Sequence, residues 1–106
     1  MIEIEQSSGN VYADLDIPEA DEMLVKAQLA AEIGEIIKRQ GLSQSQAAEI
    51  LGLPQPKISN LLRGQFRGIS QAKLLECLMR LGRDVQIVVK PAQDRTHGGR
   101  IEVVIA

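Results

Sequence analysis

The sequence has very few of the residues that build disulfide, metal or aromatic structures. Its 106 residues include one cysteine, one histidine, one tyrosine, one phenylalanine and no tryptophan. A single cysteine excludes an internal disulfide framework and a multi-cysteine zinc site. Because aromatic residues make up 2% of a chain that is 44% hydrophobic, its core must be built from Leu, Ile, Val and Ala. This composition favours one small helical domain in a reducing compartment.

Membrane and export signals are also missing from the sequence. No apolar run approaches the roughly 18 residues of a membrane span, and the acidic N-terminus lacks the basic and apolar regions of a signal peptide. We therefore expect a cytoplasmic protein with no membrane partner, whose mature chain starts near Met1.

Catalytic constellations are equally scarce. His97 has no second ligand at metal spacing, and Cys77 lies in an apolar helical pattern typical of a buried side chain. One histidine and one cysteine nearly exhaust the usual pairings of nucleophile and base, and no glycine-rich phosphate loop is present. We expect no enzymatic activity, no cofactor and no metal.

Charge is unevenly distributed along the chain. Residues 1–37 carry nine acidic side chains against one lysine, whereas residues 38–67 carry five basic side chains against one acidic one. A local basic face attracts an anion even when the total charge is negative, as it is here at −2. The middle of the chain is therefore the part in which to look for a phosphate-binding surface, although a chance asymmetry of a solvated surface would read the same way.

Four helices are predicted between Pro18 and Gly82, each closed by a glycine. The first begins near Pro18, with a possible capping box at Asp16 and Glu19, and ends at Gly41. The others are predicted over Gln44–Leu51, over about Gln55–Arg63, and from the cap Ser70 to Gly82. The apolar stripes predicted to be buried are Leu29, Ile33, Ile36 and Ile37 in the first helix and Leu74, Leu75, Leu78, Met79 and Leu81 in the fourth.

In the last part of the chain the apolar residues change from helical spacing to alternation. Val85, Ile87 and Val89 alternate with other residues, and Ile101, Val103 and Ile105 do so again after a turn-like segment. The pattern predicts two β-strands, which would need further partners because an isolated hairpin is marginal in water. The expected fold is mainly α, a four- or five-helix domain with two C-terminal strands used in dimerisation. The expected domains are an N-terminal arm (1–17), a helical domain (18–83) and a C-terminal strand pair (84–106).

The second and third predicted helices, with the glycine between them, form a helix-turn-helix. Ala47 and Ala48 allow the two helices to cross closely, and apolar contacts are expected from Leu51, Leu53, Ile58 and Leu61 or Leu62.

The third predicted helix keeps a polar face, made by Gln55, Lys57, Ser59, Asn60 and Arg63. Gln and Asn can pair with adenine, and Lys and Arg suit guanine or phosphate. This register favours DNA contact over a plain solvated face. Ser43 is expected to cap the second helix.

The stretch LSQSQAAEILGLPQPKISNLLRG resembles the Cro/repressor-like, XRE-type helix-turn-helix family along its whole length. The resemblance implies that Gln44 braces the DNA backbone, that Gln55, Pro56, Lys57 and Asn60 face the major groove, and that Ser59 and Arg63 approach phosphate. Arg67 and Lys38 are further candidates for phosphate contacts. Many family members carry Ser or Thr around the Gln where this chain has Pro54-Gln55-Pro56, so its base preference is open.

A wider part of the chain is similar to the HigA-like antitoxins, which pair with RelE/HigB-like toxins. The resemblance rests on GNVYADLDIPEADEMLVKAQLAAEIGEIIKRQGLSQSQAA and on LMRLGRDVQIVVKP. It implies a homodimer that binds a pseudo-palindromic operator in double-stranded DNA, represses its own operon and neutralises a small basic toxin. The alternatives are a stand-alone XRE-type regulator and a protein-interaction module that has lost DNA binding.

Overall fold

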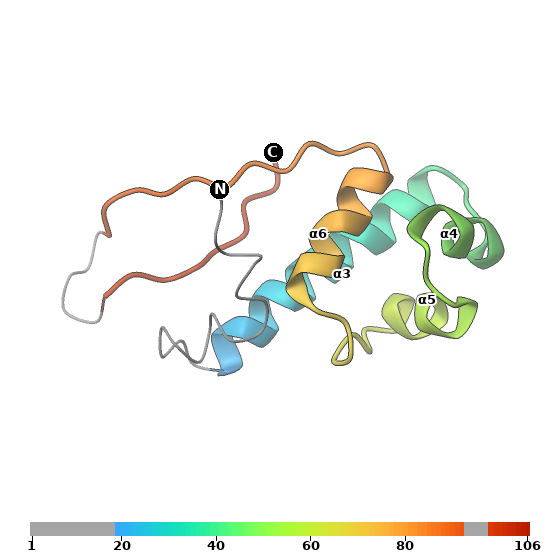
Figure 1. Cartoon of the computed structure of the whole chain (residues 1–106), viewed down its shortest axis with the longest axis horizontal. Coiled ribbons are helices and arrows are strands. Elements are labelled where there is room, and N and C mark those ends of the chain that lie inside the picture. The colour runs from blue at the N-terminus through green and yellow to red at the C-terminus, as the bar shows by residue number, and fades with distance from the viewer. Residues whose placement is uncertain (1–18, 93–97) are drawn as a thin grey trace.

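The computed structural model describes residues 19–92 and 98–106, and the described part of the chain contains four helices. They are α3 (Glu19–Arg39), α4 (Gln44–Leu51), α5 (Gln55–Leu62) and α6 (Gln71–Arg80). The long helix α3 packs against α6 and α5, and α4 packs against α5 and α6 (Figure 1). None of these helices is long and apolar enough to cross a membrane. The predicted N-terminal arm, 1–17, and the Asp16 cap lie outside the described residues.

The predicted helix ends are confirmed by local geometry. Ser43 is the N-cap of α4 in a capping box with Gln46: the Gln46 N–H donates to Ser43 Oγ (3.1 Å), and the Ser43 N–H donates to Gln46 Oε1 (2.8 Å). Ser70 caps α6 through one bond, in which its Oγ accepts from the Lys73 N–H (3.1 Å). The glycines at 41, 52, 64 and 82 all have positive φ. Local sequence signals therefore set the boundaries of these helices.

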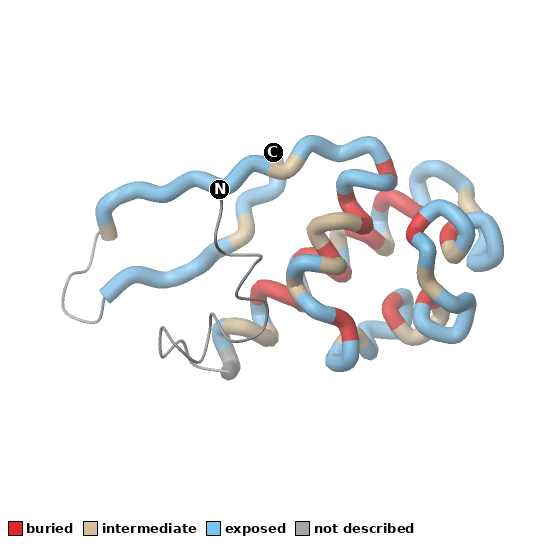
Figure 2. The backbone as a smooth tube through the Cα atoms, in the orientation of Figure 1, coloured by how far each residue is buried: buried red, intermediate tan, exposed pale blue. Residues whose placement is uncertain are grey.

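The hydrophobic core lies between the inner faces of the four helices, as the buried segments in Figure 2 show. Ile33 and Ile36 from α3, Leu51 from α4, Ile58 from α5 and Leu74 from α6 are completely buried. The predicted core is right except at Met79, which is 54% exposed, and at Leu75, which is only partly buried. The sequence did not decide whether Leu61 or Leu62 of α5 packs in the core, and the structure shows that Leu61 is the buried one.

The prediction of two C-terminal β-strands is wrong for this structure. Residues 83–92 and 98–106, here called the C-terminal tail, are extended chain and contain no strand; the first half runs away from the helices and the second half runs back toward them (Figure 1). Among the described residues, no backbone hydrogen bond joins the two halves of the tail. Alternating β-branched residues indicate a chain that fits a pleated, half-buried surface, but a strand also requires a hydrogen-bonded neighbour. In the tail only Val85 and Val103 pack against the helical core.

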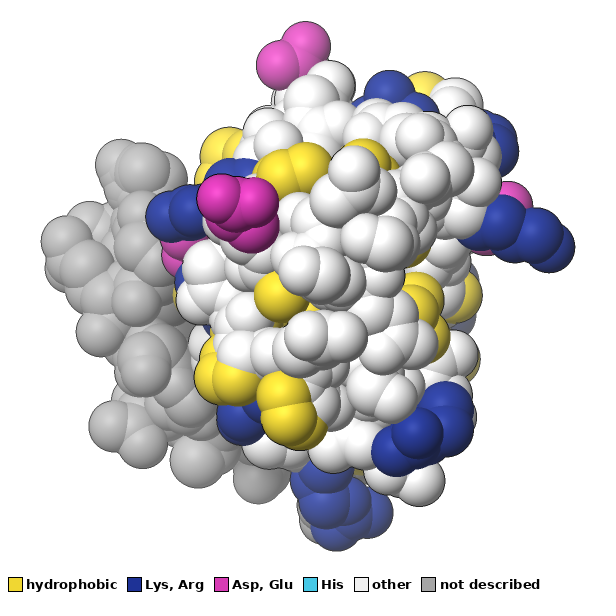
Figure 3. All heavy atoms as spheres, turned by 90° about the vertical axis from the view of Figure 1, so that its right-hand side faces the viewer, with side chains coloured by type: hydrophobic (Ala, Val, Ile, Leu, Met, Phe, Trp, Pro, Cys, Tyr) yellow, Lys and Arg dark blue, Asp and Glu magenta, His cyan; other side chains and the backbone are white. Residues whose placement is uncertain are grey.

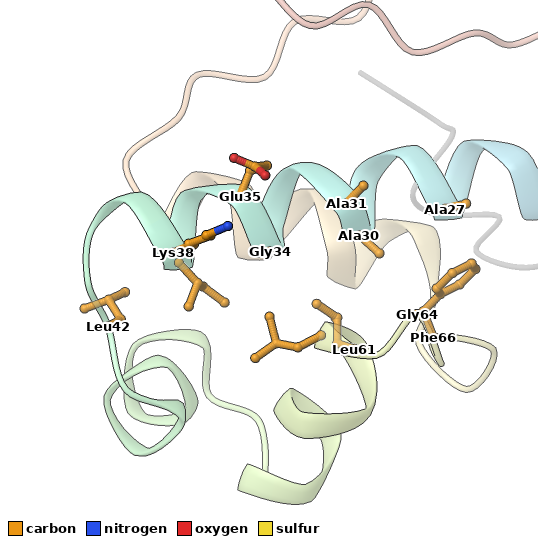
Figure 4. Close-up of a pocket in the computed structure, with 12 residues that line it drawn as sticks. Ala27, Ala30, Ala31, Gly34, Glu35, Lys38, Leu42, Leu61, Gly64 and Phe66 are labelled. Carbon is orange, nitrogen blue, oxygen red and sulfur yellow. The ribbon is translucent and has the colours of Figure 1, made fainter.

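A groove of about 640 Å³ runs between α3 and the C-terminal end of α5. Small residues of α3, including Ala27, Ala31 and Gly34, form one wall, and Leu61 and Phe66 lie on the other (Figure 4). The groove is lined mainly by carbon, so it belongs to the packing of the helical body rather than to the polar face described next.

Candidate nucleic-acid interface

The helix-turn-helix is built by α4, α5 and the turn between them. At Gly52 the chain enters the left-handed region (φ 67°), and the Gly52 N–H donates to the Ala48 carbonyl. Arg80 of α6 donates from Nη1 to the Ile50 carbonyl (3.2 Å) and from Nε to Glu76 Oε2 (2.9 Å). The C-terminal end of α4 is therefore fixed both by its own glycine cap and by a side chain from α6.

The buried and exposed sides of α5 follow from helical spacing. Ile58 and Leu61 point into the core. Positions three and four residues apart share a face of a helix, so the opposite side carries a set that we call the outward face. Its central members are Pro56, Ser59, Asn60 and Arg63, and its flanking members are Gln55 and Lys57. Ser59 and Asn60 are half-buried and the other four are exposed.

Residues of α4 and α5 meet at this face. Gln44, the first residue of α4, lines a shallow open depression together with Gln55, Pro56 and Ser59. The end of the molecule formed by α4 and α5 presents mainly uncharged surface with scattered hydrophobic side chains, and lysine and arginine side chains lie toward its rim together with fewer acidic ones (Figure 3). Neutral hydrogen-bonding groups with cations at the rim match what base edges and flanking phosphates require.

Two predicted site residues, Arg67 and Lys38, lie outside the outward face. Arg67 is exposed in the loop between α5 and α6. Lys57 extends toward the same loop, since a Cβ atom added at Gly68 would lie 3.7 Å from Lys57 Nζ. Lys38 is exposed at the end of α3 and lines the groove. The structure therefore brings four of the predicted DNA-binding residues into one depression and places Lys57 beside the α5–α6 loop.

One feature of the outward face was not predicted from the sequence. The Arg63 guanidinium turns back along α5 and donates from Nη1 to Ser59 Oγ (2.9 Å) and from Nη2 to Asn60 Oδ1 (2.5 Å). The signal was present in the spacing, because Ser59 and Asn60 precede Arg63 by four and three residues.

Metal ligands and titratable groups were compared across the described residues. Within the described ranges, no group of three or more His, Cys, Asp or Glu side chains could hold a metal ion. Burial raises the pKa of the Cys77 thiol, which lies in the core. A buried, protonated thiol is a hydrophobic core group rather than a nucleophile.

Comparison with known proteins identifies the class of fold and then the family. The model of a helix-turn-helix domain family matches residues 11–90. A solved structure described as an XRE-family transcriptional regulator is 38% identical to this chain, with a TM-score of 0.77, and the match covers 84% of this chain and 100% of that one. A search of curated proteins returned no match. The protein belongs to the XRE family of helix-turn-helix DNA-binding transcriptional regulators.

Proposed function

We propose that this protein is a sequence-specific transcriptional repressor that binds a pseudo-palindromic operator as a homodimer. The observation that carries the proposal is the outward face of α5, where polar side chains and cations project opposite the buried Ile58 and Leu61. A helix of this kind inserts into the major groove, and two-fold related copies read half-sites about 34 Å apart. A DNA-binding regulator works in the compartment that holds the DNA. The proposal therefore includes a cytoplasmic location and no enzymatic activity.

The homodimer is supported by the apolar character of the C-terminal tail. Six of its large hydrophobic side chains are exposed, among them Val88 (71%), Val89 (90%) and Val104 (80%). Exposed apolar groups clustered in this way mark an interaction surface. A second copy of the chain would cover them, and the two-fold operator requires such a copy.

The finer proposal is that the protein is the antitoxin of a type II toxin–antitoxin pair. Two features support it: the resemblance to HigA-like antitoxins and the acidic first third of the chain, of which Asp21, Glu22, Glu32 and Glu35 lie on α3 outside the core. Acidic side chains of α3, which do not belong to the outward face of α5, suit a small basic RelE/HigB-like toxin without blocking DNA. The second candidate, a stand-alone regulator, is favoured by the match to an XRE-family regulator over that protein's full length.

Expression of the gene with its flanking reading frames distinguishes these functions. The antitoxin proposal predicts that the tagged protein purifies with a stoichiometric small basic protein that is toxic when expressed alone, and that the complex retards its own promoter DNA. Promoter binding without a partner would favour the stand-alone regulator. Failure of the protein to retard the promoter in either form would contradict the repressor proposal.

The assigned DNA-reading face has its own test. Replacement of Gln55 and Lys57 together by Ala removes two exposed side chains and no core contact, so we expect loss of operator affinity with an unchanged helical circular dichroism spectrum. Each lost base contact costs about 1–3 kcal/mol. Unaltered affinity of the double variant would show that another surface binds DNA.

A further inference from the structure

Arg63 holds Asn60 in one orientation, and this follows from the chemistry of the two side chains. A guanidinium group has five N–H donors and no acceptor. Only the oxygen of the Asn60 amide can therefore face Arg63, and it does so at 2.5 Å from Nη2. The Asn60 Nδ2 group, which carries two N–H donors, is turned away from Arg63.

Ser59 strengthens this arrangement. Its Oγ accepts from Arg63 Nη1 at 2.9 Å, so the two terminal nitrogens of one planar group are held by two adjacent residues of the preceding turn of the helix. A planar fork that makes two hydrogen bonds has a defined orientation, unlike a side chain held by one. Ser59 and Asn60 are themselves half-buried, which limits their alternative rotamers.

We propose that Arg63 is a specificity-determining positioning residue, which makes Asn60 a hydrogen-bond donor toward DNA. The inference rests on the proposed function, because it concerns how the outward face reads a base. A free asparagine pairs with adenine through both its oxygen and its nitrogen, accepting from adenine N6 and donating to N7. With its oxygen turned toward Arg63, Asn60 presents its N–H donors outward and suits the major-groove acceptors of guanine (O6 and N7) or thymine (O4). Adenine offers such a donor only N7, beside its N6 amino group, and loses the bidentate pair that a free asparagine makes, and cytosine presents an amino group, so both are disfavoured.

The alternative role of Arg63 is a simple phosphate contact, and the two roles have different signatures. A phosphate contact contributes about 0.9 to the slope of log affinity against log salt for each protomer and leaves base preference unchanged. A positioning residue changes the base preference at the single position that Asn60 reads.

The experiment selects binding sites from duplexes that carry a randomised window of about two helical turns, roughly 20 base pairs. Four proteins are compared: the wild type, Asn60→Ala, Arg63→Met and the double variant that combines these two substitutions. We expect guanine or thymine at one position of each half-site in the wild-type selection, with no preference there in Asn60→Ala. In Arg63→Met, adenine should gain roughly tenfold over the wild-type base. The double variant should behave like Asn60→Ala.

Arg67→Met is the matched control, because it removes one exposed cation from the neighbouring loop. It should weaken all sequences alike and reduce the salt slope without moving any base preference. The proposal is overturned if the wild type selects adenine at the Asn60-dependent position. It is also overturned if Arg63→Met behaves like Arg67→Met.

A measurement on the free protein separates this inference from the proposed function. In nuclear magnetic resonance spectra the Arg63 guanidinium N–H groups should show hindered rotation and slowed exchange, and Asn60→Ala together with Ser59→Ala should abolish both. A freely rotating Arg63 guanidinium in the wild type would overturn the inference whether or not the protein binds DNA. Hindered rotation in a protein that selects no DNA would contradict the proposed function and, with it, the reading role of Asn60.

Discussion

At the scale of single residues, replacement by Ala is expected to have opposite effects on stability at two glycines of the helical body. Gly52 has φ 67°, and an added Cβ would lie 3.3 Å from Arg80 Nη1. Gly34 lies inside α3, where an added Cβ would be 3.6 Å from Leu62 Cδ2, an ordinary contact. Gly52→Ala should destabilise the protein by about 1–2 kcal/mol, and Gly34→Ala should stabilise it by about 0.5–1 kcal/mol.

Urea unfolding followed by far-ultraviolet circular dichroism measures both effects, and this probe suits a chain without tryptophan. Gly99→Ala is the control, since Gly99 has no positive φ and an added Cβ would meet no neighbouring atom within 4 Å. A stabilising Gly52→Ala would contradict the conformation of the turn.

Cys77 gives an expectation for alkaline pH. Burial raises the pKa of its thiol above the ordinary value of 9.0. Between that value and the higher pKa of the folded state, the thiol ionises in the unfolded chain and keeps its proton in the folded one. Ionisation there stabilises the unfolded state, so the free energy of unfolding should fall as the pH rises above 9.0. Cys77→Ala lacks this ionisation and should lose less stability over the same range.

At the scale of the element, the capping box makes α4 depend on its first residues. Ser43→Ala removes the acceptor of the Gln46 N–H and should cost about 1 kcal/mol, with faster amide exchange in the first turn of α4. Ser43→Asp keeps an acceptor at the same position and should retain most of the stability. Equal losses in the two variants would show that the cap contributes little.

Elements differed in how far the sequence could predict them. The helices were predictable because Ser43, Ser70 and the closing glycines act on backbone groups within a few residues. The tail was not, because strand formation depends on a pairing partner that no local pattern specifies. The inward positions of α5 followed from its period, whereas the contact of Arg63 with Ser59 and Asn60 depends on rotamers, which a spacing permits but does not fix.

At the scale of the whole molecule, the tail carries the proposed self-association. A chain ending at Asp84 keeps all four helices and the Arg83 N–H bond to the Leu78 carbonyl that closes α6. It loses the exposed apolar residues of the tail. We expect the full chain to sediment as a dimer at micromolar concentration and the shortened chain as a monomer with weaker operator binding. A shortened chain that stays dimeric would assign the dimer contact to the helical body.

The small number of aromatic residues in the chain has a practical consequence for spectroscopy. Phe66 is the single phenylalanine, and it is half-buried in the loop after α5, at the wall of the groove beside α3. Biosynthetic incorporation of fluorophenylalanine would therefore label one site and give one fluorine resonance without any mutation. That resonance would report on the junction between α3 and α5 as DNA or a protein partner is titrated.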